Sequence, residues 1–144
     1  IPQPSAHLTV DVGGSGDFAH LRDGWYDREK TADATARWTG PVATLAWRCA
    51  FPGAPGRITL RHFARNRPAD APPPRIWCDD VELSADSAPD AEPGCATLVA
   101  KIPAGLLRPD NLIRIEVPGW QPSESDSRVL GVFADWISLE AEAP

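Results

Sequence analysis

The residues best suited to chemistry in this sequence are its aromatic side chains, since six tryptophans are many for a chain of 144 residues. Sugars present apolar C–H faces that stack on aromatic rings, and their hydroxyls pair with polar side chains. Trp25 and Tyr26 follow Asp23-Gly24 in a predicted loop, so they are the best candidates for exposed rings. These two residues are the centre of a predicted glycan site.

Strand alternation assigns the other tryptophans to different environments. Trp47 falls on an apolar strand face and is predicted to be buried, while Trp77 lies between two apolar neighbours and is predicted to face solvent. Trp136 fits either the core or its rim. Trp38 has polar neighbours on its strand, so it belongs either to the core or to the predicted glycan site.

Four charged residues accompany these aromatics: Glu29 and Asp126 are acidic, and Arg37 and Arg128 are basic. Two interpretations remain open for them. The arginines either clamp the carboxylates in bidentate pairs that hold loop ends together, or the same cluster forms a polar pocket beside the two loop aromatics. In either case we expect the cluster to lie in one neighbourhood.

Catalytic and metal-binding signals are weak. The turn around Ser15 lacks the last glycine of a nucleophile elbow, and the histidines have no metal-site or catalytic spacing. Asp79-Asp80 suits a hairpin turn better than a glycosidase carboxylate pair. Asp11 and Asp135 are candidate ligands for a structural calcium ion between the first and last strands, with turn capping as the alternative. We expect no other cofactor.

Composition excludes several function classes. The net charge of −6 argues against nucleic acid and against anionic membrane surfaces, which bind clustered Lys and Arg. No run of 18 apolar residues exists, so direct membrane insertion is not expected. The chain contains no methionine, which indicates a processed chain or a piece of a larger protein.

The elements that must position these residues are short strands. Sixteen prolines and repeated period-2 alternation favour strands over helices. We predict one antiparallel two-sheet β-sandwich, jelly-roll-like, over residues 1–139, with 140–144 as a tail or linker stub. The predicted strands are 7–12, 18–21, 34–39, 42–51, 57–64, a hairpin over 75–83, 96–102, 112–117 and 129–139.

The strand registers also predict the core and the state of the cysteines. Cys78 and Cys95 lie on successive predicted strands and are the only plausible disulfide, and the alternative is incidental buried thiols. The seven residues predicted to be buried are Leu45, Trp47, Cys49, Ile58, Leu60, Ile113 and Ile115.

Three motifs, taken in order, resemble a known kind of module. They are Gly24-Trp25-Tyr26 followed by Glu29, then Arg37-Trp38-Thr39-Gly40, then Ser125-Asp126-Ser127-Arg128-Val129-Leu130-Gly131. The chain resembles the small β-sandwich, carbohydrate-binding-like domains appended to bacterial glycosyltransferases and sugar-transferase-like membrane proteins. The resemblance implies a jelly-roll-like fold, a glycan-binding role and an extracytoplasmic or cell-envelope location. The acidic loop 85–94 and the three cysteines depart from the pattern.

The resulting hypothesis is a non-catalytic glycan-binding module of a larger sugar-processing or cell-envelope protein. Its predicted ligand-binding residues are Trp25, Tyr26, Glu29, Arg37, Trp38, Asp126 and Arg128. The main alternative is a structural or protein-interaction domain that docks a catalytic domain of its parent chain. A small carboxylate-dependent glycosidase is the third and less favoured hypothesis.

Overall fold

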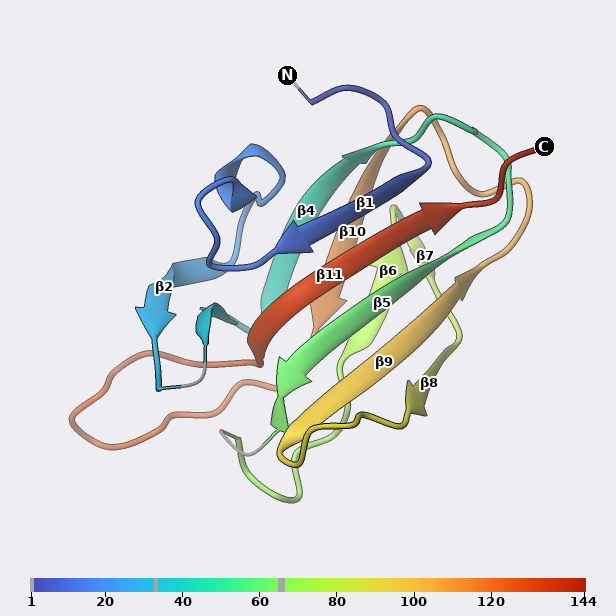
Figure 1. Ribbon diagram of the computed structural model, residues 1–144. Helices are drawn as coiled ribbons and strands as arrows, with labels where there is room; N and C mark the ends of the chain where they lie inside the picture. The colour runs from blue at the N-terminus through green and yellow to red at the C-terminus, as the bar shows by residue number, and fades with distance from the viewer. Residues whose placement is uncertain (1, 33, 65–66) are drawn as a thin grey trace.

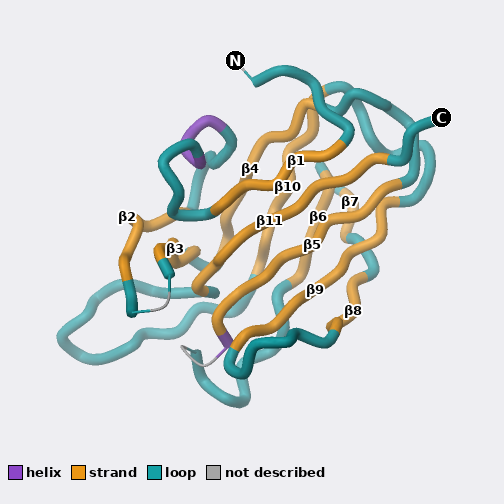
Figure 2. Tube along the Cα trace, in the orientation of Figure 1, coloured by secondary structure: helices purple, strands orange, loops and turns teal. Residues whose placement is uncertain are grey.

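The computed structural model describes residues 2–32, 34–64 and 67–144, and these ranges fold as two packed antiparallel sheets (Figure 1). The predicted all-β sandwich is confirmed, and the jelly-roll subclass stays a prediction. Helical structure in the described ranges is limited to short pieces such as the 3-10 turn η1 (Asp17–Ala19) (Figure 2). Within those ranges no helix has the length and apolar character needed to span a bilayer.

The seven-stranded sheet forms the front layer in Figure 1, with the four-stranded sheet behind it. The larger sheet has the order β2-β3-β11-β5-β9-β8, and β1 also pairs with β11; the smaller has the order β4-β10-β6-β7. The strands of the larger sheet are β1 (His7–Asp11), β2 (Trp25–Lys30), β3 (Thr35–Thr39), β5 (Gly56–Phe63), β8 (Ala85–Ala88), β9 (Cys95–Ile102) and β11 (Phe133–Ala141). Those of the smaller sheet are β4 (Val42–Arg48), β6 (Arg75–Cys78), β7 (Val81–Glu82) and β10 (Asp110–Glu116).

Strand β11 is the centre of the larger sheet. One of its edges pairs with β5, while the other is shared by β1, opposite residues 136–140, and by β3, opposite Phe133 and Ala134. The ladder with β5 is irregular between Ala134 and Trp136. A strand that contacts three others fixes the relative positions of residues from both ends of the chain.

The main core lies between the sheets and follows the predicted alternation. All seven residues predicted to be buried are buried, and Trp47 is only 1% exposed. The predicted hairpin is also confirmed: β6 and β7 pair around Asp79 and Asp80, and Asp79 has a φ of 52°, as a tight hairpin turn requires. The periodicity of these central strands therefore determined which face is buried.

A second apolar cluster lies on the outer face of the larger sheet. Phe63 and Phe133 point away from the main core, and Trp38 is opposite Phe133 in the ladder. Residues of the long 118–132 segment complete the cluster, which comprises Ala36, Trp38, Phe63, Leu130 and Phe133, with Tyr26 and Trp120 packed against it. This cluster holds the long segment against the sheet.

Several predicted elements were wrong in detail. Residues 18–21 are not a strand, because the chain turns at η1 and then follows the edge of β4, where the Ala46 amide donates to the His20 carbonyl. Gly24 leaves that edge with φ 87°, where a Cβ would lie 1.8 Å from the Val42 oxygen. The predicted polar loop contains β8, and β11 continues through Ala141, so residues 140 and 141 belong to a strand and not to the tail.

The cysteines do not form the predicted disulfide. Cys49, Cys78 and Cys95 are all free thiols. Cys78 ends β6 in the smaller sheet, whereas Cys95 begins β9 in the larger one. The prediction failed because strands that follow each other in the chain were taken as neighbours in one sheet.

His62 is a buried histidine, as its strand position predicted. It is 5% exposed on the inner face of β5, and its Nδ1 has no hydrogen-bond partner among the described residues. Burial, with a smaller contribution from the charge of Arg67, lowers the pKa of His62 from 6.5 to about 4. Between these two pKa values the His62 imidazole is therefore protonated in the unfolded chain but neutral in the folded protein.

This difference in pKa predicts that the protein loses stability on acidification at pH values where ordinary carboxylates are still ionised. Because the folded-state pKa is the lower one, the stability contributed by neutral His62 is complete above pH 6.5 and falls by about 3 kcal/mol on acidification to about pH 4. Urea unfolding at pH 7, 5.5 and 4 measures this loss. The His62→Leu variant should lose most of this pH dependence, whereas the exposed His7→Leu control should keep it; equal pH dependence in all three proteins would contradict the assignment.

Candidate functional site

Part of the predicted cluster forms, and it joins β2 to the 118–132 segment. The Arg128 guanidinium pairs with Glu29 at 2.9 Å and with Asp126 at 2.7 Å. It also lies 5.6 Å from the centre of the Tyr26 ring, and the Tyr26 hydroxyl donates to the Val129 carbonyl at 3.1 Å. The guanidinium of Arg128 holds the pKa of Asp126 below its usual value. These contacts match the structural interpretation, in which the charges pin loop ends.

The remaining predicted residues lie elsewhere. Trp25 and Tyr26 are adjacent in β2 and pack on opposite faces: Trp25 against the main core, with its indole donating to the Thr44 carbonyl at 2.8 Å, and Tyr26 in the second cluster. Trp38 is buried at 8% exposure. The two adjacent rings therefore do not form one aromatic platform.

Arg37 has a partner that the sequence did not reveal. Its Nε lies 2.6 Å from Oδ2 of Asp17 and its Nη2 lies 3.2 Å from Oδ1, so the pair is bidentate. Asp17 is 3% exposed and also accepts the Gly13 amide at 2.8 Å. Arg37 donates in addition to the Tyr26 carbonyl at 3.1 Å. This pair ties the turn 13–17 to β3.

The two predicted calcium ligands, Asp11 and Asp135, have different surroundings. Asp135 receives a hydrogen bond from Arg61 at 2.5 Å, and Arg61 also forms a bidentate pair with Asp90 at 2.9 and 3.2 Å. Asp11 is exposed on β1 opposite Trp136. No group of three or more His, Cys, Asp or Glu residues that could hold a metal ion occurs in the described part of the chain. Asp135 therefore neutralises an arginine here, and a calcium ion held by these two aspartates gains no support.

A different surface combines an accessible aromatic ring with polar groups. On the outer face of the larger sheet, the registers of β1, β11 and β5 align side chains in three rows across the strands. The rows are Asp11, Trp136 and Arg61; Thr9, Ser138 and Thr59; and His7, Glu140 and Arg57. The middle row carries only small hydroxyl side chains, so a trough runs between two rows of longer ones.

The trough is a shallow depression of about 470 Å³ lined by Trp136, by the three hydroxyl residues and by the charged row. His7 Nε2 lies 3.1 Å from the Ser138 hydroxyl, and Arg57 donates to Glu140 at 3.1 Å. Trp136 is half-buried, and its indole N–H has no acceptor among the residues that the structure describes. The trough therefore offers a polar ligand one ring edge or face, an ion pair, and a row of hydroxyls in which Thr9 and Ser138 already contact the His7 imidazole.

Sequence reasoning missed this surface because Trp136 could be assigned to the core or to the rim with equal justification. The signal was present in residues 136–140, where Trp136, Ser138 and Glu140 alternate with the apolar Ile137 and Leu139. That pattern places Trp136 on the polar face of its strand.

Comparisons with known proteins supply no independent identification. No protein-family profile matches the chain, and no curated protein matches it significantly. The resemblance to glycosyltransferase-associated modules therefore stays a prediction.

Proposed function

We propose that this domain is a non-catalytic glycan-binding module and that its binding surface is the trough beside Trp136. The observation that carries the proposal is the placement of one accessible indole next to a row of hydroxyl side chains on an open sheet face. A sugar ring stacked on the indole would leave its hydroxyls within reach of the middle row. Aromatic stacking combined with a few oriented polar groups is the usual chemistry of such sites.

The shape of the trough favours an extended saccharide chain. Its rows run across the strands, and the middle row continues through Val99 of β9 to Asp86 of β8. Neighbouring strands lie about 4.8 Å apart, so five strands span roughly 19 Å. A linear glycan lying across the strands would contact several strands at once, whereas a single sugar would occupy the end near Trp136.

The experiment is a glycan array on the isolated domain, followed by titration of the best ligand. Trp136→Ala is expected to weaken binding by about tenfold or more, because it removes the stacking surface. It should change the free energy of unfolding by no more than about 1 kcal/mol, because the ring packs on the outside of the sheet.

Trp77→Ala is the matched control. Trp77 is a half-buried tryptophan on the outer face of the other sheet, beneath the guanidinium of Arg114. The Trp77→Ala substitution should leave the glycan affinity unchanged. Binding that survives Trp136→Ala but is lost in Trp77→Ala would move the site to the opposite face, and an array without ligands would reject glycan binding.

A protein-interaction domain is the second candidate, and one surface favours it. Val42 and Leu112 are each 46% exposed on the outer face of the four-stranded sheet. Leu112 is opposite Ala46 and Val42 is opposite Glu116, so the two residues would be separate contact points for a docked partner and not one continuous patch. If the array finds no ligand, docking through this face to a catalytic domain of the parent chain becomes the favoured function.

A further inference from the structure

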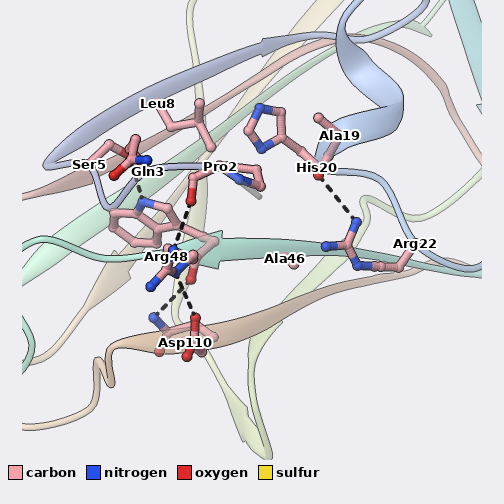
Figure 3. A pocket seen from close by; sticks show the side chains of 12 residues that line it. Pro2, Gln3, Ser5, Leu8, Ala19, His20, Arg22, Ala46, Arg48 and Asp110 are labelled. Carbon is pink, nitrogen blue, oxygen red and sulfur yellow. Dashed lines mark hydrogen bonds and ion pairs between the residues drawn. The ribbon is translucent and has the colours of Figure 1, made fainter.

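A second cavity lies at the open edge of the sandwich, away from the glycan trough. Its volume is about 550 Å³, within the range of small-molecule sites. Three parts of the chain surround it: the N-terminal residues 2–5 with Leu8, the end of η1 with His20 and Arg22, and β4 with the start of β10. Figure 3 shows the side chains of Leu8, His20, Arg22 and Arg48 arranged around this space.

The N-terminal segment is held in place as one wall. The Ser5 amide donates to the Arg48 carbonyl at 2.9 Å, and the Ala50 amide donates to the Ser5 carbonyl at 3.0 Å. The Trp47 indole donates to the Ser5 hydroxyl at 3.3 Å. These bonds fix Ser5 against β4, and the Arg48 guanidinium donates to the Pro2 carbonyl at 3.1 Å, so both ends of the segment 2–5 are held against the strand.

The charges of the cavity are positive in sum, although the whole chain carries −6. Arg48 lies 3.4 Å from Asp110, which offsets one positive charge. Arg22 donates to the carbonyls of Ala19 and Leu21 at 3.3 and 3.1 Å, and it has no acidic partner among the described residues. One guanidinium charge therefore remains uncompensated at the rim.

His20 is another polar residue of the cavity, along with Arg22 and Arg48. Its ring points into the cavity beside Leu8 and Ala19 in Figure 3, and its nitrogens have no partner within the described ranges. Burial, together with the charge of Arg22, lowers the pKa of His20 below its usual value. At neutral pH the imidazole is therefore uncharged and offers one donor and one acceptor.

The remaining lining is partly apolar and also includes the polar side chains of Gln3 and Asn111. Pro2, Leu8, Ala19 and Ala46 line the space between the two arginines. Arg22 and Arg48 lie at opposite ends of it along β4, because Arg22 pairs with Thr44 and Arg48 is four residues further on, roughly 13 Å away. A ligand that satisfies these groups has an anionic end and an apolar body.

We propose that this cavity binds a small organic oxyanion, with the anionic group on the guanidinium of Arg22, a polar atom on His20 and the apolar body against Leu8 and Ala46. Carboxylate and phosphate both match the planar donor pattern of arginine. The proposal does not rest on glycan binding, since none of its residues lies on the trough beside Trp136.

The experiment is an NMR titration of the full chain that follows the Trp47 indole N–H, which borders the cavity. Benzoate should shift this signal in a saturable way, and the isosteric neutral benzamide should shift it much less. Phenyl phosphate and inorganic phosphate test the other oxyanion: tighter binding of phenyl phosphate than of benzoate assigns the site to phosphate esters, and the reverse assigns it to carboxylates. Binding of inorganic phosphate as tight as that of phenyl phosphate would show that the apolar walls contribute nothing and would overturn the proposed ligand class.

Arg22→Ala should weaken the binding of the preferred anion by about tenfold or more, as expected for loss of a charge-assisted pair. Arg28→Ala is the control, because it removes the same charge from an exposed position on β2. Trp136→Ala should leave anion affinity unchanged, which separates this site from the glycan trough. Equal shifts with benzoate and benzamide, or equal weakening by Arg22→Ala and Arg28→Ala, would overturn the proposal.

Discussion

Replacing Trp38 with alanine is expected to lower the free energy of unfolding by about 3–5 kcal/mol, the cost of deleting a large buried aromatic side chain. Trp38 is 8% exposed, stacks on Phe133 at a centroid distance of 4.9 Å and meets Trp120 edge-on at 5.4 Å. Removing the central ring leaves both neighbours without their contact. Urea unfolding of the purified domain measures the loss.

The same variant should loosen a particular part of the molecule. Trp120 and Leu130 belong to the 118–132 segment, and the second cluster is the apolar contact that they make with the sheet. Limited proteolysis should therefore cut Trp38→Ala within this segment sooner than it cuts the unmodified chain. Trp77→Ala is the size-matched control, with a smaller stability loss and no change at this segment; a loss below 1 kcal/mol for Trp38→Ala would show that the segment is held by its ion pairs instead.

Asp17→Ala should have an effect of similar size, about 3 kcal/mol, because it removes one partner of a buried ion pair. Arg37 would keep its charge with its side chain only 17% exposed, and the Gly13 amide would lose its acceptor. Asp126→Ala is the comparison: Asp126 and Arg128 are each about a third exposed, and pairs of that kind contribute up to about 1 kcal/mol. Equal losses of unfolding free energy in the two variants would show that burial gives the Asp17–Arg37 pair no extra contribution to stability.

The pH dependence of Asp17 has a definite sign. Burial alone would raise the pKa of its carboxyl, but the hydrogen bonds from Arg37 and Gly13 outweigh burial and hold the pKa below the usual value of 3.8. A carboxyl with a lowered folded-state pKa contributes its stability above pH 3.8 and loses it as the pH falls through the folded-state pKa. Acid unfolding below about pH 4 should therefore be less steep in Asp17→Ala than in the unmodified chain.

Strand alternation was sufficient for the inner faces of β4, β5 and β10. Residues such as Leu45, Leu60 and Ile113 alternate with polar ones, and their burial follows from the period of the strand alone. The partnership of Glu29 with Arg128 was also anticipated, since both belong to motifs with opposite charges.

The predictions for Trp25, Tyr26, Arg37 and Trp136 were wrong or incomplete because the position of each side chain depends on strand pairing and on tertiary contacts. Trp25 and Tyr26 were assigned to a loop because Asp23-Gly24 precedes them, yet strand β2 begins directly after the glycine, and a strand sends adjacent side chains to opposite faces. Ala36 and Trp38 lie in the second cluster on the outer face, so Arg37 between them points to the inner side of the sheet, where it needs a carboxylate. Which carboxylate it meets depends on how the turn 13–17 folds back, and that is a tertiary property. The trough beside Trp136 likewise depends on the register of three strands that are far apart in sequence.

The position of β11 also governs the order in which the larger sheet is completed during synthesis. Among the strands of the described residues, the one made last pairs with β1, the first, and with β3 and β5. Until β11 emerges, β1 has no partner strand, and the inner edges of β3 and β5 stay open, whereas β4, β6, β7 and β10 of the smaller sheet are already complete. Pairings of such long sequence separation are slow to form. The nascent chain therefore passes through a stage with unpaired strand edges, which is when it is most exposed to association with other chains.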